Sequence, residues 1–385
     1  MPDGFDAPRA HGSLSSWDDY PVHQVAETVR HVATSDRNFY DRYYFNCHSN
    51  DGEAFLVVGM GQYPNLGVQD AFACLVHGST HRVVRASREL GDRMDLSVGP
   101  LSVEVVRPLR ELRVTCEPDR PDGGRGDLSF DLHWVGSTPA YEEPRQFLRK
   151  HGRVLFDTMR LAQTGRWSGT ITSGDRTFEV APDTWWGTRD RSWGVRPVGE
   201  EEPAGIRTEG QMVGMWNYAP MQFEDHSILY MVNEHADGHR ELSEAVRIWN
   251  DPDRPPEPLG RPEHDAVLTP GTRRIEHSLL RFPEAPGGGL EVDVAPLLDC
   301  WLMLGTGYGL EQDWRHGMYQ GPLVVQDLEV DYEREPERLF GLVDQVARFE
   351  QRGGPASGAV GYGLHEFFFI GGFPRYGLVD WDPAP

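Results

Sequence analysis

Lysine is almost absent from this chain of 385 residues, in which Lys150 is the only lysine among 37 basic residues. Schiff-base chemistry therefore has a single candidate, and it lies in a charged stretch that we expect to be solvated. Cysteine is also scarce: Cys47, Cys74, Cys116 and Cys300 are far apart and show no CxxC spacing. The wide separation of the four cysteines indicates neither a zinc site nor a thioredoxin motif, so we expect no metal.

Long apolar runs are missing as well. Runs such as those at 301–304 and 367–370 fall far short of the roughly 20 residues that a membrane helix needs. Segment 1–20 has no apolar centre and no early basic region, so it does not look like a secretory signal, and we expect a flexible tail. These absences favour a cytoplasmic protein with reduced thiols and no integral membrane association.

Positive charge is in deficit, because 60 acidic residues against 37 basic ones give a net charge of -23. This average field repels nucleic acid and anionic membrane surfaces, so neither is an expected partner. The glycine-rich stretch 305–309 is not followed by the Lys-Ser/Thr pair of a phosphate-binding loop, and no G-x-S-x-G, HExxH or EF-hand pattern occurs. We expect no nucleotide or other cofactor.

What the chain does contain is regular punctuation by 43 glycines and 29 prolines, with short runs rich in Val, Phe, Tyr and Trp between them. This rhythm is typical of many short antiparallel strands. Segment 128–134 alternates apolar and polar residues with a period of two, as a strand with one buried face does. Hairpins are predicted at 53–77 and 166–180.

The predicted fold is therefore all-β, with two antiparallel β-barrel or sandwich domains and a few peripheral helices. Helical spacing favours short helices at 22–31, 141–150 and 336–352. The length predicts two domains. Their boundary is expected in the acidic loop 198–205, which gives the tail 1–20, a first domain at 21–198 and a second at 199–385.

The densest constellation of chemical groups lies at 185–196. Tryptophan rarely clusters on a plain surface, so this segment predicts the wall of an apolar cavity. The alternative is a structural belt in which an Arg–Asp pair and stacked rings close the end of a barrel. The three tryptophans are expected to be mostly buried near the contact between the halves. The candidate site residues here are Trp185, Trp186, Arg189, Asp190, Arg191 and Trp193.

Two further groups are weaker candidates for a pocket wall. Tyr44, Asn46 and His48 share one face of a predicted strand, and Trp216 and Tyr218 belong to an adaptable apolar stretch. A structural role for the first group and a plain core role for the second are the alternatives.

Three acid–histidine pairs are adjacent in the sequence: Asp225-His226, Glu234-His235 and His365-Glu366. Adjacent residues in a strand point to opposite faces, so sequence spacing alone makes none of them a catalytic dyad.

The stretch WWGTRDRSWG at 185–194 resembles the hallmark of the carotenoid 1,2-hydratase (hydroxyneurosporene synthase) and AttH-like superfamily. The segments FYDRYYFNCHSNDGEAFLVVGMGQYPN at 39–65 and GYGLHEFFFIGGFPRYG at 361–377 resemble a two-domain bacterial branch of it. The resemblance implies two calycin-like, that is lipocalin-like, domains. In the hydratases an acidic residue of this motif protonates an alkene, and only Asp190 carries over. Where they have histidine this chain has Arg189, whose charge would lower the pKa of Asp190.

The first hypothesis for function is that the chain binds an apolar small molecule, such as a terpenoid, polyketide or lipid-like compound. It would then catalyse hydration, cyclisation or isomerisation without a cofactor. The alternatives are a non-catalytic carrier or sensor of such a molecule, and barrels that bind a partner. An acid with a raised pKa in a closed apolar pocket would favour the enzyme. A pocket without inward ionisable groups would favour the carrier, and a filled barrel would favour a protein that binds a partner.

Overall fold

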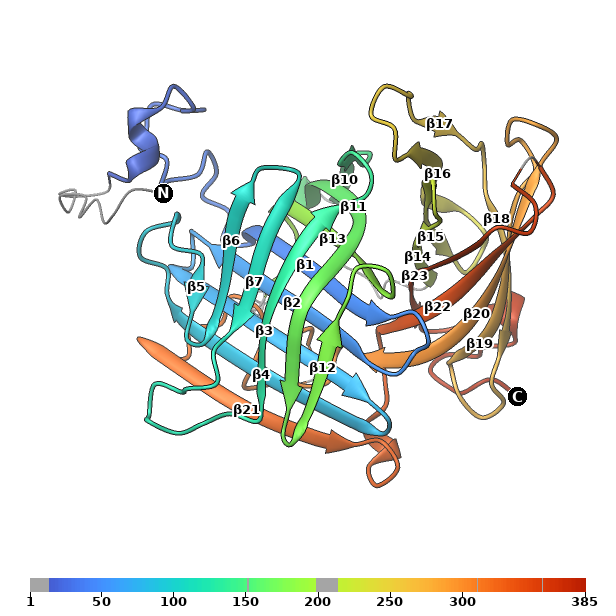
Figure 1. Cartoon of the computed structure of the whole chain (residues 1–385). Helices are drawn as coiled ribbons and strands as arrows, with labels where there is room; N and C mark the ends of the chain where they lie inside the picture. Colours follow the sequence, from blue (N-terminus) through green and yellow to red (C-terminus); the bar gives the residue numbers. More distant parts are fainter. Residues whose placement is uncertain (1–13, 151, 199–213, 310, 355) are drawn as a thin grey trace.

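The computed structural model describes residues 14–150, 152–198, 214–309, 311–354 and 356–385. In this part of the chain the only helical elements are three 3-10 turns, at Ser16–Asp19, Pro336–Arg338 and Pro374–Tyr376. All other regular structure is strand, arranged in two large antiparallel sheets that lie side by side (Figure 1). The predicted all-β class is confirmed. None of the helical turns described approaches the length and hydropathy of a membrane-spanning helix.

The first sheet curls into a nearly closed barrel, with the strand order β21-β4-β3-β2-β1-β13-β11-β8-β7-β6-β5. Three short strands, β9, β10 and β12, pair with the long strand β11. The bounds are β1 Phe39–Ser49, β2 Phe55–Tyr63, β3 Val68–His77, β4 Thr80–Glu89, β5 Ser97–Val98, β6 Leu101–Arg107, β7 Glu111–Cys116, β8 Leu128–Gly136, β9 Tyr141–Glu142, β10 Gln146–Lys150, β11 Arg153–Ser173, β12 Arg176–Val180, β13 Trp185–Val195 and β21 Leu323–Asp331.

The second sheet bends as a half-barrel, with the order β17-β16-β15-β14-β23-β22-β20-β19-β18. Its strands are β14 Gly214–Gln222, β15 His226–His235, β16 Arg240–Trp249, β17 Glu257–Pro258, β18 Glu263–Leu268, β19 Ile275–Phe282, β20 Leu290–Trp301, β22 Val343–Arg352 and β23 Val360–Ile370.

Side chains fill the barrel, as the period-two pattern of β8 predicts. Leu128, Phe130, Leu132 and Trp134 are all buried in its interior, with the intervening residues more exposed. The Trp134 and Trp167 rings lie 5.0 Å apart between centroids. The space lined by Trp167 and its neighbours on β1, β2, β7 and β8 is too small for a water molecule. This part of the barrel therefore has no room for a ligand.

A separate core joins the two sheets. The outward faces of β1, β2, β3 and β4 contribute apolar residues that pack against Tyr218, Met231, Val346 and Leu364 of the second sheet. Because the barrel wall is apolar on both sides, its strands β2 and β3 are buried along nearly their whole length. The barrel and the half-barrel are thus held by a common hydrophobic layer.

One strand crosses the expected division of the chain. β21 comes from the second half of the sequence but pairs with β4 along its full length, from Leu323 opposite Arg88 to Asp331 opposite Thr80 (Figure 1). The expected first domain, 21–198, therefore lacks one strand of its own sheet. Of the predicted boundary loop, 199–205 lies outside the described residues, as does 1–13 of the predicted tail.

The helix predictions are wrong. Segment 336–352 forms one 3-10 turn followed by β22, because β22 lies between two cores and is buried on both faces. Val343 and Phe349 face the half-barrel core while Val346 faces the layer between the sheets, and this two-sided burial imitates helical spacing. Segment 141–150 forms β9 and β10, and segment 22–31 contains only bends and turns.

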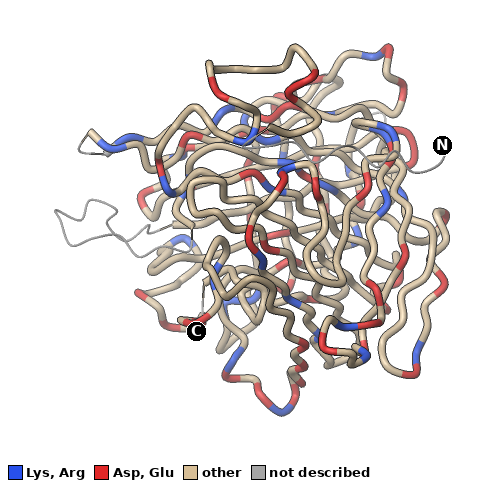
Figure 2. Tube along the Cα trace, turned by 90° about the vertical axis from the view of Figure 1, so that its left-hand side faces the viewer, with Lys and Arg blue, Asp and Glu red and all other residues tan. Residues whose placement is uncertain are grey.

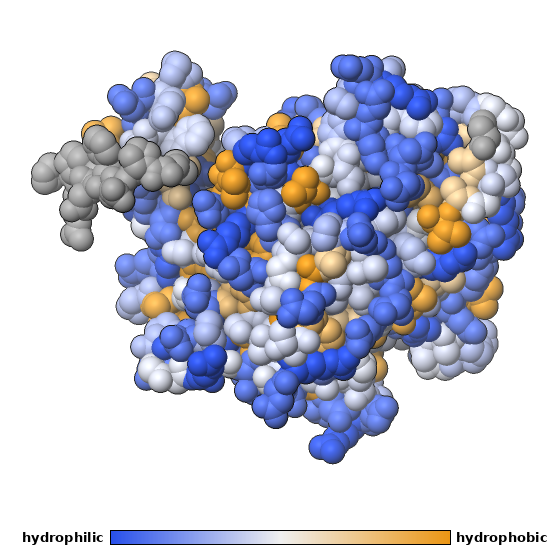
Figure 3. All heavy atoms as spheres, viewed as in Figure 1, coloured by the Kyte–Doolittle hydropathy of each residue, from blue (hydrophilic) through white to orange (hydrophobic). Residues whose placement is uncertain are grey.

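Acidic and basic residues are interspersed along strands and loops, with no long block of either sign in view (Figure 2). Many arginines pair with carboxylates across neighbouring strands, such as Arg113 with Asp131 and Arg281 with Asp265. On the face shown in Figure 3, apolar residues form small separated spots within a mostly polar surface. The negative net charge is therefore spread over the molecule.

Candidate functional site

A cavity of about 310 Å³ lies between the barrel wall and the half-barrel. Strands β1, β11 and β13 supply one side, and β14, β15, β16 and β23 supply the other. Its volume is at the lower end for small-molecule sites. The aromatic lining residues are Tyr40, Tyr43, Tyr44, Phe156, Trp216, Tyr308 and Phe368, and the charged ones are Arg42, Glu143, Arg160, Asp190, Arg196 and Glu366.

Alternation along β13 decides which part of the Trp-Arg motif reaches this cavity. Asp190 and Ser192 line it, on the outward face of the barrel wall. Residues at odd positions face the other way, and Trp185 is packed in the barrel core. Register places Asp190 between Tyr44 of β1 and Ala162 of β11. The motif thus presents its carboxylate to the second sheet.

The predicted pairing of Asp190 with a neighbouring arginine is wrong. Arg189 donates from Nε to Gln163 Oε1 at 2.9 Å, and Arg191 forms an ion pair with Asp41. Both arginines lie on the face of β13 opposite Asp190. Within the described residues, Asp190 has no hydrogen bond or ion pair.

Burial therefore governs the protonation of Asp190. It raises the pKa of Asp190 to about 6, although the Arg160 guanidinium opposes the shift; the carboxylates of Glu143 and Glu366 raise the pKa further. The sequence-based expectation of a pKa lowered by Arg189 is overturned, because the strand turns that side chain away.

Beside Asp190, a buried ion pair spans the cavity wall. The Arg160 guanidinium contacts Glu143, and the Tyr218 hydroxyl donates to Glu143 Oε1 at 3.2 Å. The same guanidinium lies 4.6 Å from the centroid of the Tyr218 ring. Burial raises the pKa of Glu143 despite the nearby Arg160. Tyr218 is therefore a support of the wall, one layer behind the lining residues.

The half-barrel side carries a second set of carboxyl groups. The Trp216 indole N–H donates to Glu366, and the Tyr44 hydroxyl donates to Asp344 Oδ2 at 2.6 Å. Asp344 and Glu366 are directly opposite on β22 and β23. Burial and the charge of Glu366 raise the pKa of Asp344 well above its ordinary value. These contacts fix the orientation of Trp216 and Tyr44, the aromatic residues that flank the space in front of Asp190.

The remaining end of the cavity is cationic. Arg42 donates to His316 Nδ1 at 2.9 Å and lies 5.1 Å from the Tyr308 ring centroid, while Arg196 lies over the Tyr40 ring. Burial and the charge of Arg42 hold the pKa of His316 well below its usual range, so the ring is neutral and accepts this hydrogen bond. Such guanidinium groups suit a carbonyl or anionic oxygen of a ligand.

The other predicted site residues lie elsewhere. Asn46 accepts from the Thr188 N–H at 2.9 Å and donates to the Thr188 hydroxyl at 2.5 Å, which bridges a gap in the β1–β13 ladder. His48 is fully buried on the same face, where burial lowers its pKa to about 4. Trp186 packs edge-on against Tyr362 of the second half.

Two of the three tryptophans of the motif are buried as predicted. Trp185 is 5% exposed and Trp186 is 6% exposed, but the prediction is wrong for Trp193, which is 37% exposed. Trp193 has the same parity as Trp185, so it lies on the face of β13 that is turned away from the second sheet, near the C-terminal end of the strand. Burial of the motif on that face thus ends before Trp193.

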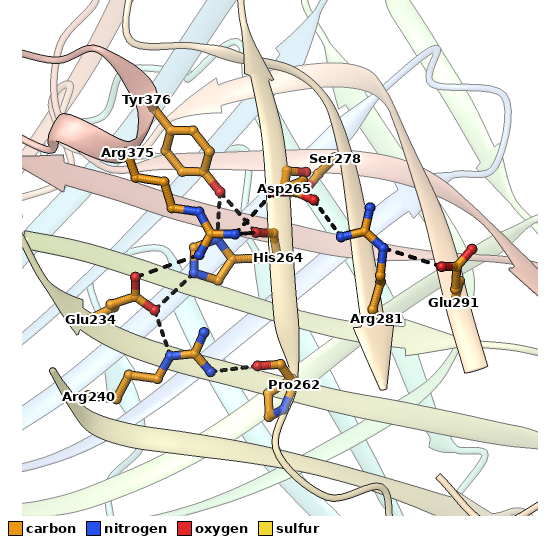
Figure 4. A network of polar contacts seen from close by, with 10 residues as sticks. All are labelled: Glu234, Arg240, Pro262, His264, Asp265, Ser278, Arg281, Glu291, Arg375 and Tyr376. Carbon is orange, nitrogen blue, oxygen red and sulfur yellow. Dashed lines mark hydrogen bonds and ion pairs between the residues drawn. The ribbon is translucent and has the colours of Figure 1, made fainter. Parts of the chain in front are cut away.

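The acids of the three acid–histidine neighbours contact different partners. Asp225 and His226 do contact each other at 2.6 Å, against expectation, because they lie at a strand start rather than within a strand. Glu366 binds Trp216, and Glu234 binds His264 at 3.2 Å rather than its sequence neighbour. His264 also contacts the Tyr376 hydroxyl at 2.6 Å, within the arginine-rich network of Figure 4. This network ties the C-terminal segment to β18 and β15.

Comparison with known families assigns the chain. Residues 14–379 match a family of unknown function, DUF8625. The chain belongs to DUF8625. A search of the curated proteins finds no match to its sequence.

Solved structures share the fold of this DUF8625 member at low sequence identity. An AttH-like protein, NE1406 from Nitrosomonas europaea, is 11% identical with a TM-score of 0.53, over 94% of this chain and 98% of that chain. CghA, solved alone and with Sch210972, is 12% identical with a TM-score of 0.51, over 87% and 89%. Kievitone hydratase from Nectria haematococca is 12% identical with a TM-score of 0.43, over 85% and 88%. The AttH-like fold implied by the motif is confirmed.

Several lining residues of the DUF8625 chain were missed by sequence reasoning. Arg42 could have been found, because it alternates with Tyr44 and Asn46 along one strand and therefore lies on the same face. A charged residue on a face expected to be covered is unusual and indicates a functional site. Glu143 was hidden by the incorrect helix at 141–150. Nothing local indicates that Tyr308 folds back onto β1.

Proposed function

We propose that this chain binds a small, largely apolar molecule between its two sheets and that Asp190 transfers a proton to it. The reaction class is hydration, cyclisation or isomerisation of a terpenoid, polyketide or lipid-like substrate. The observation that carries the proposal is a partly buried carboxyl group that faces an aromatic-lined cavity and has no partner of its own among the described residues. Its pKa of about 6 keeps it near the point where proton donation and return are both favourable.

The surrounding groups suit such a transfer. Protonation of an alkene carbon by Asp190 leaves a carbocation, which water or an internal nucleophile captures, or which loses a neighbouring proton. The Tyr44 and Trp216 rings offer π faces to the cation, and Asp190 takes back the released proton. Arg42 and Arg160 can hold a carbonyl oxygen on which negative charge develops.

A carrier is less well supported by this cavity. Six charged side chains line it, and burying them costs free energy that simple storage of an apolar molecule does not require. CghA, which has the same fold, was solved with Sch210972, so a bound compound is compatible with this architecture.

The test begins with mass spectrometry of compounds that co-purify with the full chain, followed by turnover assays on the compound identified. Asp190→Asn should still bind the compound but lose turnover by roughly 100- to 10,000-fold, the usual contribution of general acid catalysis. Asp183→Asn, in the exposed turn before β13, is the matched control and should keep both properties. Unchanged turnover per folded molecule in Asp190→Asn would reject the catalytic role and favour a carrier.

A further inference from the structure

A second group of side chains with potential metal-binding atoms lies outside the cavity. Cys74 on β3, His81 on β4 and Cys300 on β20 are all buried, and their donor atoms lie within 4.8 Å of one another. The two cysteines are 226 positions apart in sequence, which is why spacing predicted no site. Only the packing of the half-barrel onto the barrel wall brings them together.

Two of the three separations are close to those between ligands of one tetrahedral ion, and the third, between Cys300 and His81, is no more than 4.8 Å. The Cys74 and Cys300 sulfurs are 3.6 Å apart, and the Cys74 sulfur is 3.2 Å from His81 Nε2. With metal–sulfur bonds of 2.3 Å and metal–nitrogen bonds near 2.0 Å, tetrahedral geometry places ligands about 3.5–3.8 Å apart. A disulfide requires a sulfur separation of about 2.05 Å and so would need the two strands to approach further.

The surroundings orient the histidine for binding through one nitrogen. The Tyr332 hydroxyl lies 2.5 Å from His81 Nδ1, so Nδ1–H can donate to it while Nε2 faces the sulfurs. Metal-bound histidines commonly hold their second nitrogen in this way. The Leu304 carbonyl oxygen lies 3.0 Å from Nε2, so it can accept a hydrogen bond from this nitrogen when no ion is bound.

Charge balance selects the ion. Both cysteines belong to the apolar layer between the sheets, with Val76, Val83 and Leu302 among its members. Two thiolates, a neutral imidazole and a divalent ion sum to zero, whereas a monovalent copper ion would leave a buried negative charge. Thiolate and imidazole ligands together suit zinc.

We propose that Cys74, His81 and Cys300 bind a zinc ion that joins the barrel to the half-barrel. The ion would tie β3 and β4 to the end of β20, in the layer that carries the cavity wall. This role is structural, since the ligands are buried and lie outside the cavity lining.

The test uses the full chain expressed in zinc-supplemented medium under reducing conditions. Elemental analysis should find about one zinc per chain in the wild type and in Cys116→Ala, a buried cysteine in the barrel core, and at least a tenfold loss in Cys300→Ala. Cobalt added to metal-free wild type should give the visible bands of a four-coordinate thiolate site. Tyr332→Phe should weaken zinc binding by roughly 10- to 100-fold.

If Cys300→Ala does not fold, X-ray absorption on wild-type protein replaces it and should show sulfur at about 2.3 Å and nitrogen at about 2.0–2.1 Å from zinc. Wild-type protein that carries no zinc and gives no cobalt bands would overturn the proposal. So would a mass lower by two hydrogens together with thiols protected from alkylation, which would identify a disulfide instead.

Discussion

Asp190 shows how the second sheet changes the chemistry of one side chain. Its strand neighbours Arg189 and Arg191 are directed to the other face, so the carboxyl group meets a covering sheet without a cation bonded to it. Burial then favours the protonated form. This property belongs to the assembled protein, because the same residue in an unfolded chain has an ordinary pKa.

The protonation of Asp190 predicts a specific dependence of stability on pH. Its folded pKa of about 6 lies above its ordinary value of 3.8, so between these values the folded state keeps a proton that the unfolded state loses. Stability contributed by this group is complete below about pH 4 and falls as pH rises, by at most about 1.4 kcal/mol per pH unit, until about pH 6.

Asp190→Asn removes this titration. The variant's free energy of unfolding relative to wild type should therefore rise by about 1–3 kcal/mol between pH 4 and pH 6.5. Urea denaturation at a series of pH values measures the difference, and Asp183→Asn should show no such trend. Parallel curves for Asp190→Asn and wild type would mean that the carboxyl group is ionised throughout this range.

The Arg160–Glu143 pair gives a second test. Arg160→Gln leaves a buried carboxyl group, 4% exposed in its side chain, without its cation, and should cost about 3 kcal/mol. Arg145→Gln breaks the pair with Asp157, whose side chains are 58% and 32% exposed, and should cost less than about 1 kcal/mol. Thermal unfolding compares the two. Adding Glu143→Gln to Arg160→Gln should recover part of the loss, and failure to do so would place the cost in packing.

Among the strands, the β1–β13 pair explains why the motif contains glycine. The ladder runs to Phe45 opposite Arg189 and resumes at His48 opposite Trp186. In the gap, the Asn46 carbonyl turns to accept the Trp167 indole N–H at 2.7 Å. A Cβ on Gly187 would lie 2.0 Å from that carbonyl oxygen. The glycine therefore allows the strand to pass a rotated peptide.

Gly187→Ala should destabilise the protein by more than about 2 kcal/mol, because the clash is with backbone in the middle of a sheet. Gly78→Asn is the control: it lies at a hairpin turn with φ +59° and open space around it, where asparagine is tolerated. Urea denaturation of both variants measures the difference. Equal losses would show that β1 can shift to accept the extra carbon.

In the whole molecule, the barrel and half-barrel depend on each other. β21 pairs with β4, and the outward faces of β2 and β3 are covered by residues from the second half. A barrel made from the first half alone would expose this apolar face and the unpaired edge of β4.

Residues 21–198 expressed alone should therefore aggregate or bind a hydrophobic dye strongly, and co-expression with 199–385 should restore a soluble complex. Size-exclusion chromatography and dye fluorescence report the outcome, with the intact chain as reference. A monomeric fragment that unfolds cooperatively near the wild-type temperature would show that the first half is an independent domain.

Most of the fold was predictable from sequence, because strand period and turn residues are local properties. The inward face of β8 and both predicted hairpins follow from patterns less than 30 residues long. The helix prediction at 336–352 is wrong because β22 is buried on two faces. Apolar residues that face two different cores can be spaced along a strand as they would be along a helix. The motif at 185–194 indicated the fold and identified Asp190 as the candidate acid.

The sequence alone determined the all-β class and the family resemblance, and it indicated the carboxyl group of Asp190 as the candidate acid. The tertiary structure decided that the cavity lies between the sheets, that Arg189 and Arg191 turn away from Asp190, and that Cys74 meets Cys300. The physical reason is that these facts depend on contacts between residues far apart in the chain. Strand parity assigns a side chain to a face, but only the packing of two sheets determines what that face meets.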